Sequence, residues 1–132
     1  MIHKLFAITC FLLATATVVG EERFSAEDIA FFETKVRPVL VTHCQDCHSG
    51  EEPESRFSVE FREAFLTGGE FGPAAKPGKP TESLLISAIK HDEFLKMPPK
   101  EKLTSAQVVD LTRWVEMGLP WPEEKSGITA NI

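Results

Sequence analysis

The stretch Cys44-Gln45-Asp46-Cys47-His48 contains two thiols three residues apart, with an imidazole directly after the second. A stretch of this kind can bind zinc, form a redox-active disulfide or attach a haem covalently. Each of these chemistries requires different further ligands and a different pattern of helices and strands in the rest of the chain. The fold and the function therefore depend on which of these the sequence provides.

The surroundings favour covalent haem. Zinc requires four ligands, usually in two closely spaced pairs, and the other imidazoles after residue 20, His43 and His91, form no second pair. A thioredoxin-like disulfide would lie in an alternating strand–helix pattern, which the sequence lacks. In haem c, two thiols at this spacing add to the two vinyl groups of one porphyrin, and His48 would then be the proximal iron ligand. Zinc and a redox pair remain as alternatives.

The first twenty residues have the pattern of an export signal. Lys4 precedes an apolar, uncharged run from 5 to 19, which ends at Gly20 before two acidic residues. The run is shorter than the ~20 residues of a membrane-spanning helix and matches a secretory signal peptide. We expect residues 1–20 to be removed near Gly20, which makes the mature protein periplasmic and not inserted in a membrane. An uncleaved anchor is the alternative.

Composition restricts the function further. Cys10 lies within the apolar run, so the mature chain keeps only Cys44 and Cys47, too few for a disulfide-stapled domain. The chain has 132 residues and a formal charge of −6, which argues against nucleic acid and anionic membrane surfaces as partners. The chain after Gly20 is long enough for one domain but marginal for an independent core. A buried cofactor would supply the missing apolar mass.

Two helical stretches are predicted on either side of a long irregular region. Ser25, followed by acidic residues, is a typical helix start. An apolar stripe then runs toward Cys44, and Pro38 is expected to kink or restart this helix. Residues 81–90 form the second predicted helix, which comes after a loop rich in Gly and Pro.

A third helix has the clearest boundaries. Thr104 and Gln107 form a capping box, and Gly118 is expected to end the helix. A short helix is also predicted within 58–66, closed by a Gly-Gly pair. No alternating strand pattern appears, so we predict an all-α domain with three main helices and long loops around a cofactor.

Met97 is the predicted second axial ligand of the iron. It lies in Lys96-Met97-Pro98-Pro99-Lys100, where two prolines stiffen the backbone and reduce the ordering cost of holding a thioether in place. The alternative is that Met97 fills a gap in the core. Met117 lies in the last helix, where packing is the expected role. His43 and His91 are rival ligands. His43 is expected to be too near the attachment stretch to reach across the ring, and His91 is expected to be a capping or surface residue.

The motifs between Ser25 and Pro122, in their order, resemble the planctomycete-type cytochrome c domain. They are Phe31-Phe32-Glu33-Thr34-Lys35-Val36-Arg37-Pro38-Val39-Leu40, Cys44-x-x-Cys47-His48, Gly68-Gly69, Gly72-Pro73-Ala74, Pro77-Gly78-x-Pro80, Ser83-Leu84-Leu85, Lys96-Met97-Pro98-Pro99, and Trp114-Val115 to Pro120-Trp121-Pro122. The resemblance implies a class I-like cytochrome c fold over 25–122. Residues 123–132 lack a periodic pattern, so we expect a flexible tail there.

The resemblance also implies roles for individual residues. One haem c would be bound through Cys44 and Cys47, with His48 and Met97 as its axial ligands. The carbonyl of Pro73 would hold the other ring nitrogen of His48, by similarity to the Gly-Pro turn of class I cytochromes. Arg56 is a further expectation, as a partner for a haem propionate. The stretch 57–61 is bulkier and less acidic than the family pattern, so we expect the local loop geometry to differ there but not the haem site.

Ligation on both faces of the iron predicts an electron carrier without catalytic residues. A haem enzyme or gas sensor with a displaceable Met97 is one alternative, and a docking module stabilised by its haem is another. The expected partners are redox proteins, meeting the side of Lys96, Lys100 and Lys102 in a protein expected to be monomeric. This side is basic, whereas residues 51–70 are acidic.

Overall fold

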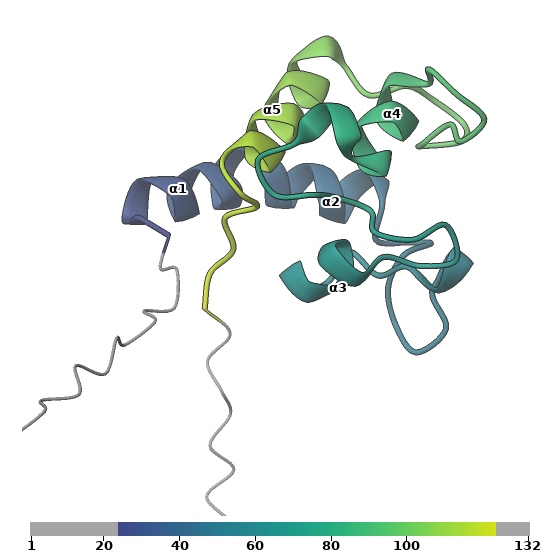
Figure 1. Ribbon diagram of the computed structural model, residues 1–132, viewed down its shortest axis with the longest axis horizontal. Helices are drawn as coiled ribbons and strands as arrows, with labels where there is room; N and C mark the ends of the chain where they lie inside the picture. Colours follow the sequence, from purple (N-terminus) through teal and green to yellow (C-terminus); the bar gives the residue numbers. More distant parts are fainter. Residues whose placement is uncertain (1–23, 124–132) are drawn as a thin grey trace, which may run out of the picture.

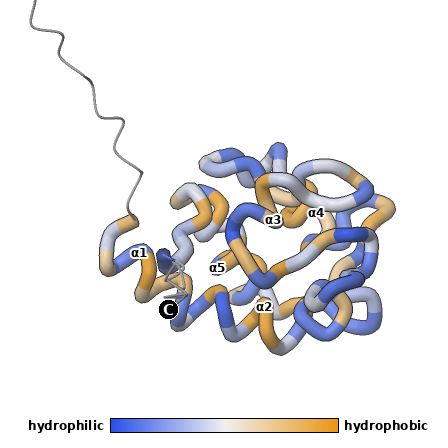
Figure 2. Tube along the Cα trace, turned by 90° about the horizontal axis from the view of Figure 1, so that it is seen from below, coloured by the Kyte–Doolittle hydropathy of each residue, from blue (hydrophilic) through white to orange (hydrophobic). Residues whose placement is uncertain are grey.

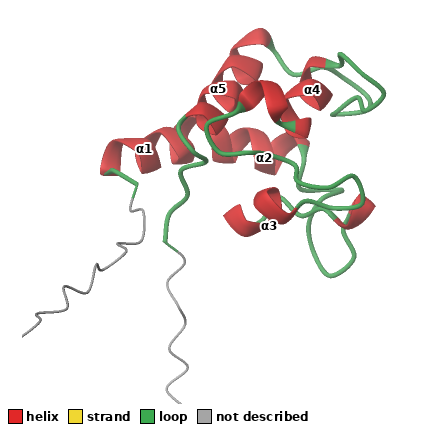
Figure 3. Cartoon of the chain, in the orientation of Figure 1, coloured by secondary structure: helices red, strands yellow, loops and turns green. Residues whose placement is uncertain are grey.

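The computed structural model describes residues 24–123. The predicted signal peptide, residues 1–20, lies outside this part of the chain, and so does the predicted tail beyond Glu123. Residues 24–123 form helices and loops with no strand (Figure 3), apart from an isolated bridge between Gly69 and Gly72. The prediction of an all-α domain is confirmed for the described residues.

The first helical stretch consists of α1 (Ala26–Phe31), a π-helical turn η1 (Phe32–Val36) and α2 (Arg37–His43). The Ser25 hydroxyl accepts the Asp28 N–H at 3.1 Å, and the Asp28 carboxylate accepts the Ser25 N–H at 3.1 Å, which completes a capping box. Pro38 has no N–H to donate within the helix, and the chain restarts as α2 one residue earlier, after the π turn. The predicted restart at Pro38 is confirmed.

The second helix begins later than predicted. The expected helix at 81–90 is divided into a 3-10 turn η3 (Pro80–Glu82) and α4 (Leu84–Lys90). Ser83 lies between them in an extended conformation, where its hydroxyl donates to the Lys79 carbonyl at 2.8 Å and accepts the Lys76 N–H at 2.9 Å. These bonds hold Ser83 to the preceding loop, so the helix begins only after it.

The third helix, α5 (Ser105–Glu116), has the predicted boundaries. The Gln107 N–H donates to the Thr104 hydroxyl at 3.2 Å, and the Gln107 side-chain oxygen accepts the Thr104 N–H at 2.9 Å. Gly118 comes after the helix with a φ of +91°, a left-handed conformation that glycine adopts without steric cost.

The region between α2 and α4 holds a 3-10 turn η2 (Glu54–Arg56) and α3 (Arg62–Thr67). The helix expected within 58–66 is therefore shorter and lies later, but it ends at the predicted glycine pair. Gly68 has a φ of +71°, and a Cβ atom there would lie 1.7 Å from the Gly72 carbonyl oxygen. The backbone of Gly72 can approach only because residue 68 has no side chain.

Helices α1 and α2 follow one line across the molecule, with α5 and α4 on one side of it and α3 on the other (Figure 1). Hydrophobic and hydrophilic residues recur along each helix, as a one-sided core contact requires (Figure 2). The centre of the core is a cluster of four buried aromatic rings from α3, α5, the π turn and the segment after α5. They are Phe32, Phe65, Trp114 and Trp121.

Candidate functional site

A cleft lies beside the aromatic core, between the end of α2, the loops around η2 and Gly69, helix α4 and the loop after α4. It contains about 980 Å³ of space, including the part open to solvent. Most of its lining is apolar. The larger apolar lining residues are Leu40, Phe57, Val59, Phe71, Leu84, Leu85, Ile89, Leu95 and Met97.

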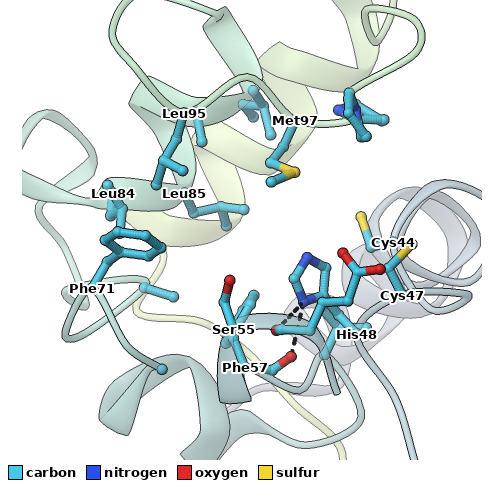
Figure 4. A pocket seen from close by; sticks show the side chains of 18 of the residues that line it. Cys44, Cys47, His48, Ser55, Phe57, Phe71, Leu84, Leu85, Leu95 and Met97 are labelled. Atoms are coloured by element: carbon cyan, nitrogen blue, oxygen red, sulfur yellow. Dashed lines mark hydrogen bonds between the residues drawn. The ribbon is translucent and has the colours of Figure 1, made fainter. Parts of the chain in front are cut away.

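One wall of the cleft is formed by the C-x-x-C-H stretch (Figure 4). Helix α2 ends at His43, and the chain then turns tightly, with the Cys47 and His48 N–H groups donating to the Cys44 carbonyl at 3.3 and 3.0 Å. This turn places both thiols and the His48 ring on the same cleft. Cys44 is half-buried and Cys47 is exposed, and both thiols are free.

Burial changes the acidity of one thiol. Desolvation, and secondarily the neighbouring Cys47, raises the pKa of the Cys44 thiol from 9.0 to about 11. In the folded chain without a cofactor, the Cys44 thiol therefore loses its proton only at a higher pH than an ordinary thiol.

The His48 ring is held by two backbone carbonyls. Its Nδ1 atom lies 3.0 Å from the Phe57 carbonyl oxygen and 3.1 Å from the Glu54 carbonyl oxygen. Because carbonyl oxygens only accept hydrogen bonds, Nδ1 must carry the proton, and the lone pair of the imidazole is then on Nε2. Nε2 faces the cleft (Figure 4), as a metal-binding nitrogen would.

The prediction that Pro73 supplies this carbonyl is wrong. Residues Ser55 and Arg56 both have a φ of +54°, and this left-handed turn directs the carbonyls that flank it toward His48. The Gly72-Pro73 segment instead packs against Gly68. Phe57, whose carbonyl is one of the two partners of His48, begins the 57–61 stretch, where only the loop geometry was expected to differ.

Met97 lies on the other wall. Its thioether points into the cleft from the side opposite His48 (Figure 4), and Pro98 and Pro99 line the cleft beside it. The Met97 N–H donates to the Ala88 carbonyl at 3.0 Å, which attaches the loop to the end of α4. Met117 lies at the end of α5 and is not among the described residues that line the cleft.

The two rival histidines have other contacts. His43 lines the cleft, but its Nε2 lies 3.3 Å from the Gln107 side-chain nitrogen, which can only donate. His91 lies outside the lining; it is the C-cap of α4, as expected, and its Nε2 lies 3.2 Å from the Met97 carbonyl oxygen. The contact between His91 and Met97 was missed by sequence reasoning, as were the carbonyls of Glu54 and Phe57.

Charged groups near the cleft are mainly acidic. Glu54 and Glu70 line it, and no Lys or Arg of residues 24–123 does. The Arg56 side chain is 86% exposed, with its Nε 3.7 Å from a Glu70 carboxylate oxygen, so its expected role toward a propionate has no support in this arrangement. Within residues 24–123, no three His, Cys, Asp or Glu side chains gather into a metal-binding group.

Comparison with known proteins agrees with this geometry. Residues 44–101, just under half of the chain, match the family described as planctomycete cytochrome C. No curated protein and no solved structure matches the chain. The matched segment begins at the first thiol and extends past Met97, so it contributes to both walls of the cleft. Over residues 44–101 the chain is therefore similar to the planctomycete cytochrome C family, a family of c-type cytochromes.

Proposed function

We propose that this protein is an exported one-electron carrier that holds a single haem c through Cys44 and Cys47, with His48 and Met97 as axial ligands. The observation that supports this function is the placement of the two ligand types across one apolar cleft, with the imidazole beside both thiols and the thioether opposite (Figure 4). None of the helices in residues 24–123 combines the length and hydrophobicity needed to cross a membrane.

The residues present fit a haem. The apolar lining suits the body of a porphyrin, both thiols share one wall, and the protonated Nδ1 of His48 leaves Nε2 for the metal. A bound haem supplies one ferric–ferrous couple. Met97, attached to α4 through its own N–H, would bind the iron through its thioether, and a thioether ligand would favour the ferrous state. Two protein ligands leave no coordination position for a substrate.

We also propose that a redox partner with an acidic surface docks on the side of the Met97 loop, with the protein acting as a monomer. Lys96, Lys100 and Lys102 are exposed and flank the segment that lines the cleft. Their positive charge would speed association with an acidic partner. Salt would weaken this attraction, because it screens charges separated by more than ~8–10 Å.

The ferric absorption spectrum of the holoprotein tests the ligation. The full chain is produced with and without haem-maturation machinery, together with Met97→Ala and, as the matched control, Met117→Ala. A thioether ligand gives a weak band at the red end of the ferric spectrum. We expect this band in the parent and in Met117→Ala but not in Met97→Ala. Its presence in Met97→Ala would refute Met97 ligation, and an open iron in the parent would favour an enzyme or a gas sensor.

A further inference from the structure

Both backbone polar groups of Met97 are bonded to the end of α4. The Met97 N–H donates to the Ala88 carbonyl at 3.0 Å, and the Met97 carbonyl accepts from Nε2 of His91 at 3.2 Å. The Ala88 carbonyl also accepts the His91 N–H at 3.1 Å. The loop at 92–96 therefore leaves the last turn of α4 and returns to the same turn.

The bond to the Met97 carbonyl restricts a backbone rotation that the bond from the Met97 N–H leaves free. A single bond at the Met97 N–H would hold the chain in place but allow the peptide after Met97 to rotate. Pro98 and Pro99 have no N–H, so the next two residues offer no backbone donor that could stop this rotation. The bond from His91 holds the carbonyl on the far side of the Met97 Cα, and the two bonds together fix the direction of the Met97 Cα–Cβ bond.

The backbone at position 91 has a conformation that costs a histidine more than a glycine. His91 has φ 60° and ψ 31°, the left-handed conformation at a helix C-terminus that normally belongs to glycine or asparagine. Glycine at position 91 would have no side-chain donor for the Met97 carbonyl. The amide nitrogen of an asparagine would lie one bond closer to Cα than Nε2 does, and the side chain would be too short to reach that carbonyl. A strained residue with a long donor is consistent with a local function.

We propose that His91 is a positioning residue for the sixth ligand, and that its hydrogen bond to the Met97 carbonyl keeps the thioether directed into the cleft. This inference rests on the proposed function for the role of Met97. His91 does not line the cleft and acts only through Met97. Without the bond, the thioether would point into the cleft for a smaller fraction of the time and would exclude external ligands less effectively.

Three variants of the full-length holoprotein separate positioning from a structural role. His91→Gly suits the left-handed backbone and removes the donor. His91→Asn also suits the backbone but places its amide nitrogen three bonds from Cα. His91→Gln places its amide nitrogen four bonds from Cα, as Nε2 is in histidine. A purely structural role predicts that His91→Gly is at least as good as the parent in every measurement.

The measurements are the red ferric band, carbon monoxide affinity of the ferrous protein, and the urea midpoint. We expect His91→Gly and His91→Asn to lose most of the band and to bind carbon monoxide roughly tenfold more tightly, about the worth of one hydrogen bond. The urea midpoint of His91→Gly should not fall, and His91→Gln should restore most of the band. Parent-like bands and affinities in both His91→Gly and His91→Asn would overturn the proposal.

Hydrogen exchange of the Met97 amide distinguishes this inference from the proposed function. If the parent holoprotein lacks the red band, the His/Met ligation itself fails. The contact with His91 is then tested by exchange, which we expect to be roughly tenfold faster in His91→Gly than in the parent and in His91→Gln. Equal exchange in all three proteins would show that His91 does not position Met97.

Discussion

The Nδ1 atom of His48 lies 3.0 Å from the carbonyl oxygen of Phe57, and this contact depends on a close backbone approach elsewhere. The turn that carries Phe57 is held by the Ser55 carbonyl, which accepts the Glu70 N–H at 2.9 Å. A Cβ atom on Gly69 would lie 2.2 Å from that same Ser55 oxygen. The carbonyl partner of His48 is therefore positioned through a close approach to Gly69, a residue distant from it in the sequence.

Gly69→Ala should destabilise the protein by about 1–3 kcal/mol, the range for an inserted methyl group that backbone must move to accept. Gly69 has no positive φ, so this cost is purely steric. Gly50→Ala is the control, because Gly50 has a φ of +80° but open space around its Cβ direction; it should cost only about 1 kcal/mol. Urea unfolding measures both, and equal stability of Gly69→Ala and the parent would contradict the packing described.

Replacing both Cys44 and Cys47 by serine should release the haem to acidic acetone and lower the stability of the chain, because the apolar cleft loses its cofactor. Cys10→Ser is the matched control and should keep the haem bound. The measurement is the distribution of haem absorbance after extraction. Haem that remains with the double variant after extraction would show that attachment does not use these thiols.

The two thiols should differ in their reaction with iodoacetamide in the chain made without haem. Only the thiolate reacts, and the raised pKa of Cys44, about 11, keeps it protonated until the pH approaches that value. Because the folded state favours the neutral thiol, stability should fall as the pH rises from 9 toward 11.

Mass spectrometry at a pH of about 8, just below the ordinary thiol pKa, should find exposed Cys47 alkylated before Cys44, and urea should remove the difference. Equal rates in the absence of urea would contradict the burial of Cys44.

Arg62 connects α3 to the end of α5. Its guanidinium donates to the carbonyls of Leu119 and Gly118, both at 3.0 Å. Arg62→Ala should cost about 1–3 kcal/mol, since part-buried carbonyls lose a charged donor. Arg56→Ala is the control; its side chain is 86% exposed, and the change should stay within about 0.5 kcal/mol. Thermal unfolding of the two variants compares them, and equal losses would refute a special role for Arg62.

Reversing Lys96, Lys100 and Lys102 to glutamate should slow electron exchange with an acidic partner protein at low salt, because steering toward the Met97 loop is lost. The effect should shrink at high salt, and exchange with a basic partner should not slow. Reversal of Lys35, Lys76 and Lys79, which belong to other segments of the chain, gives the same change of net charge. If the first triple variant reacts with the acidic partner as fast as the parent, the docking surface lies elsewhere.

Features that depend on neighbouring residues could be predicted from the sequence. The capping boxes at Ser25 and Thr104 each involve residues three positions apart, so the sequence alone contains both partners. The restart at Pro38 results from its missing N–H. The thiols and His48 share one wall because they are neighbours within a single turn.

Contacts between distant segments were decided by the tertiary structure. The carbonyl partner of His48 was expected at Pro73, yet it comes from Glu54 and Phe57, because the left-handed turn between them is held in place by the chain near Gly69. Such a turn has no signature that spacing or composition can reveal.

The sequence by itself determined the chemistry of this protein: the C-x-x-C-H stretch, a methionine in a stiff proline loop and the helices that carry them. Only the tertiary structure decided which groups orient the two candidate ligands. A backbone carbonyl is present at every residue, so its identity as a partner depends on where a loop returns. For His48 that is the η2 turn, and for Met97 it is the end of α4, where His91 meets the Met97 carbonyl.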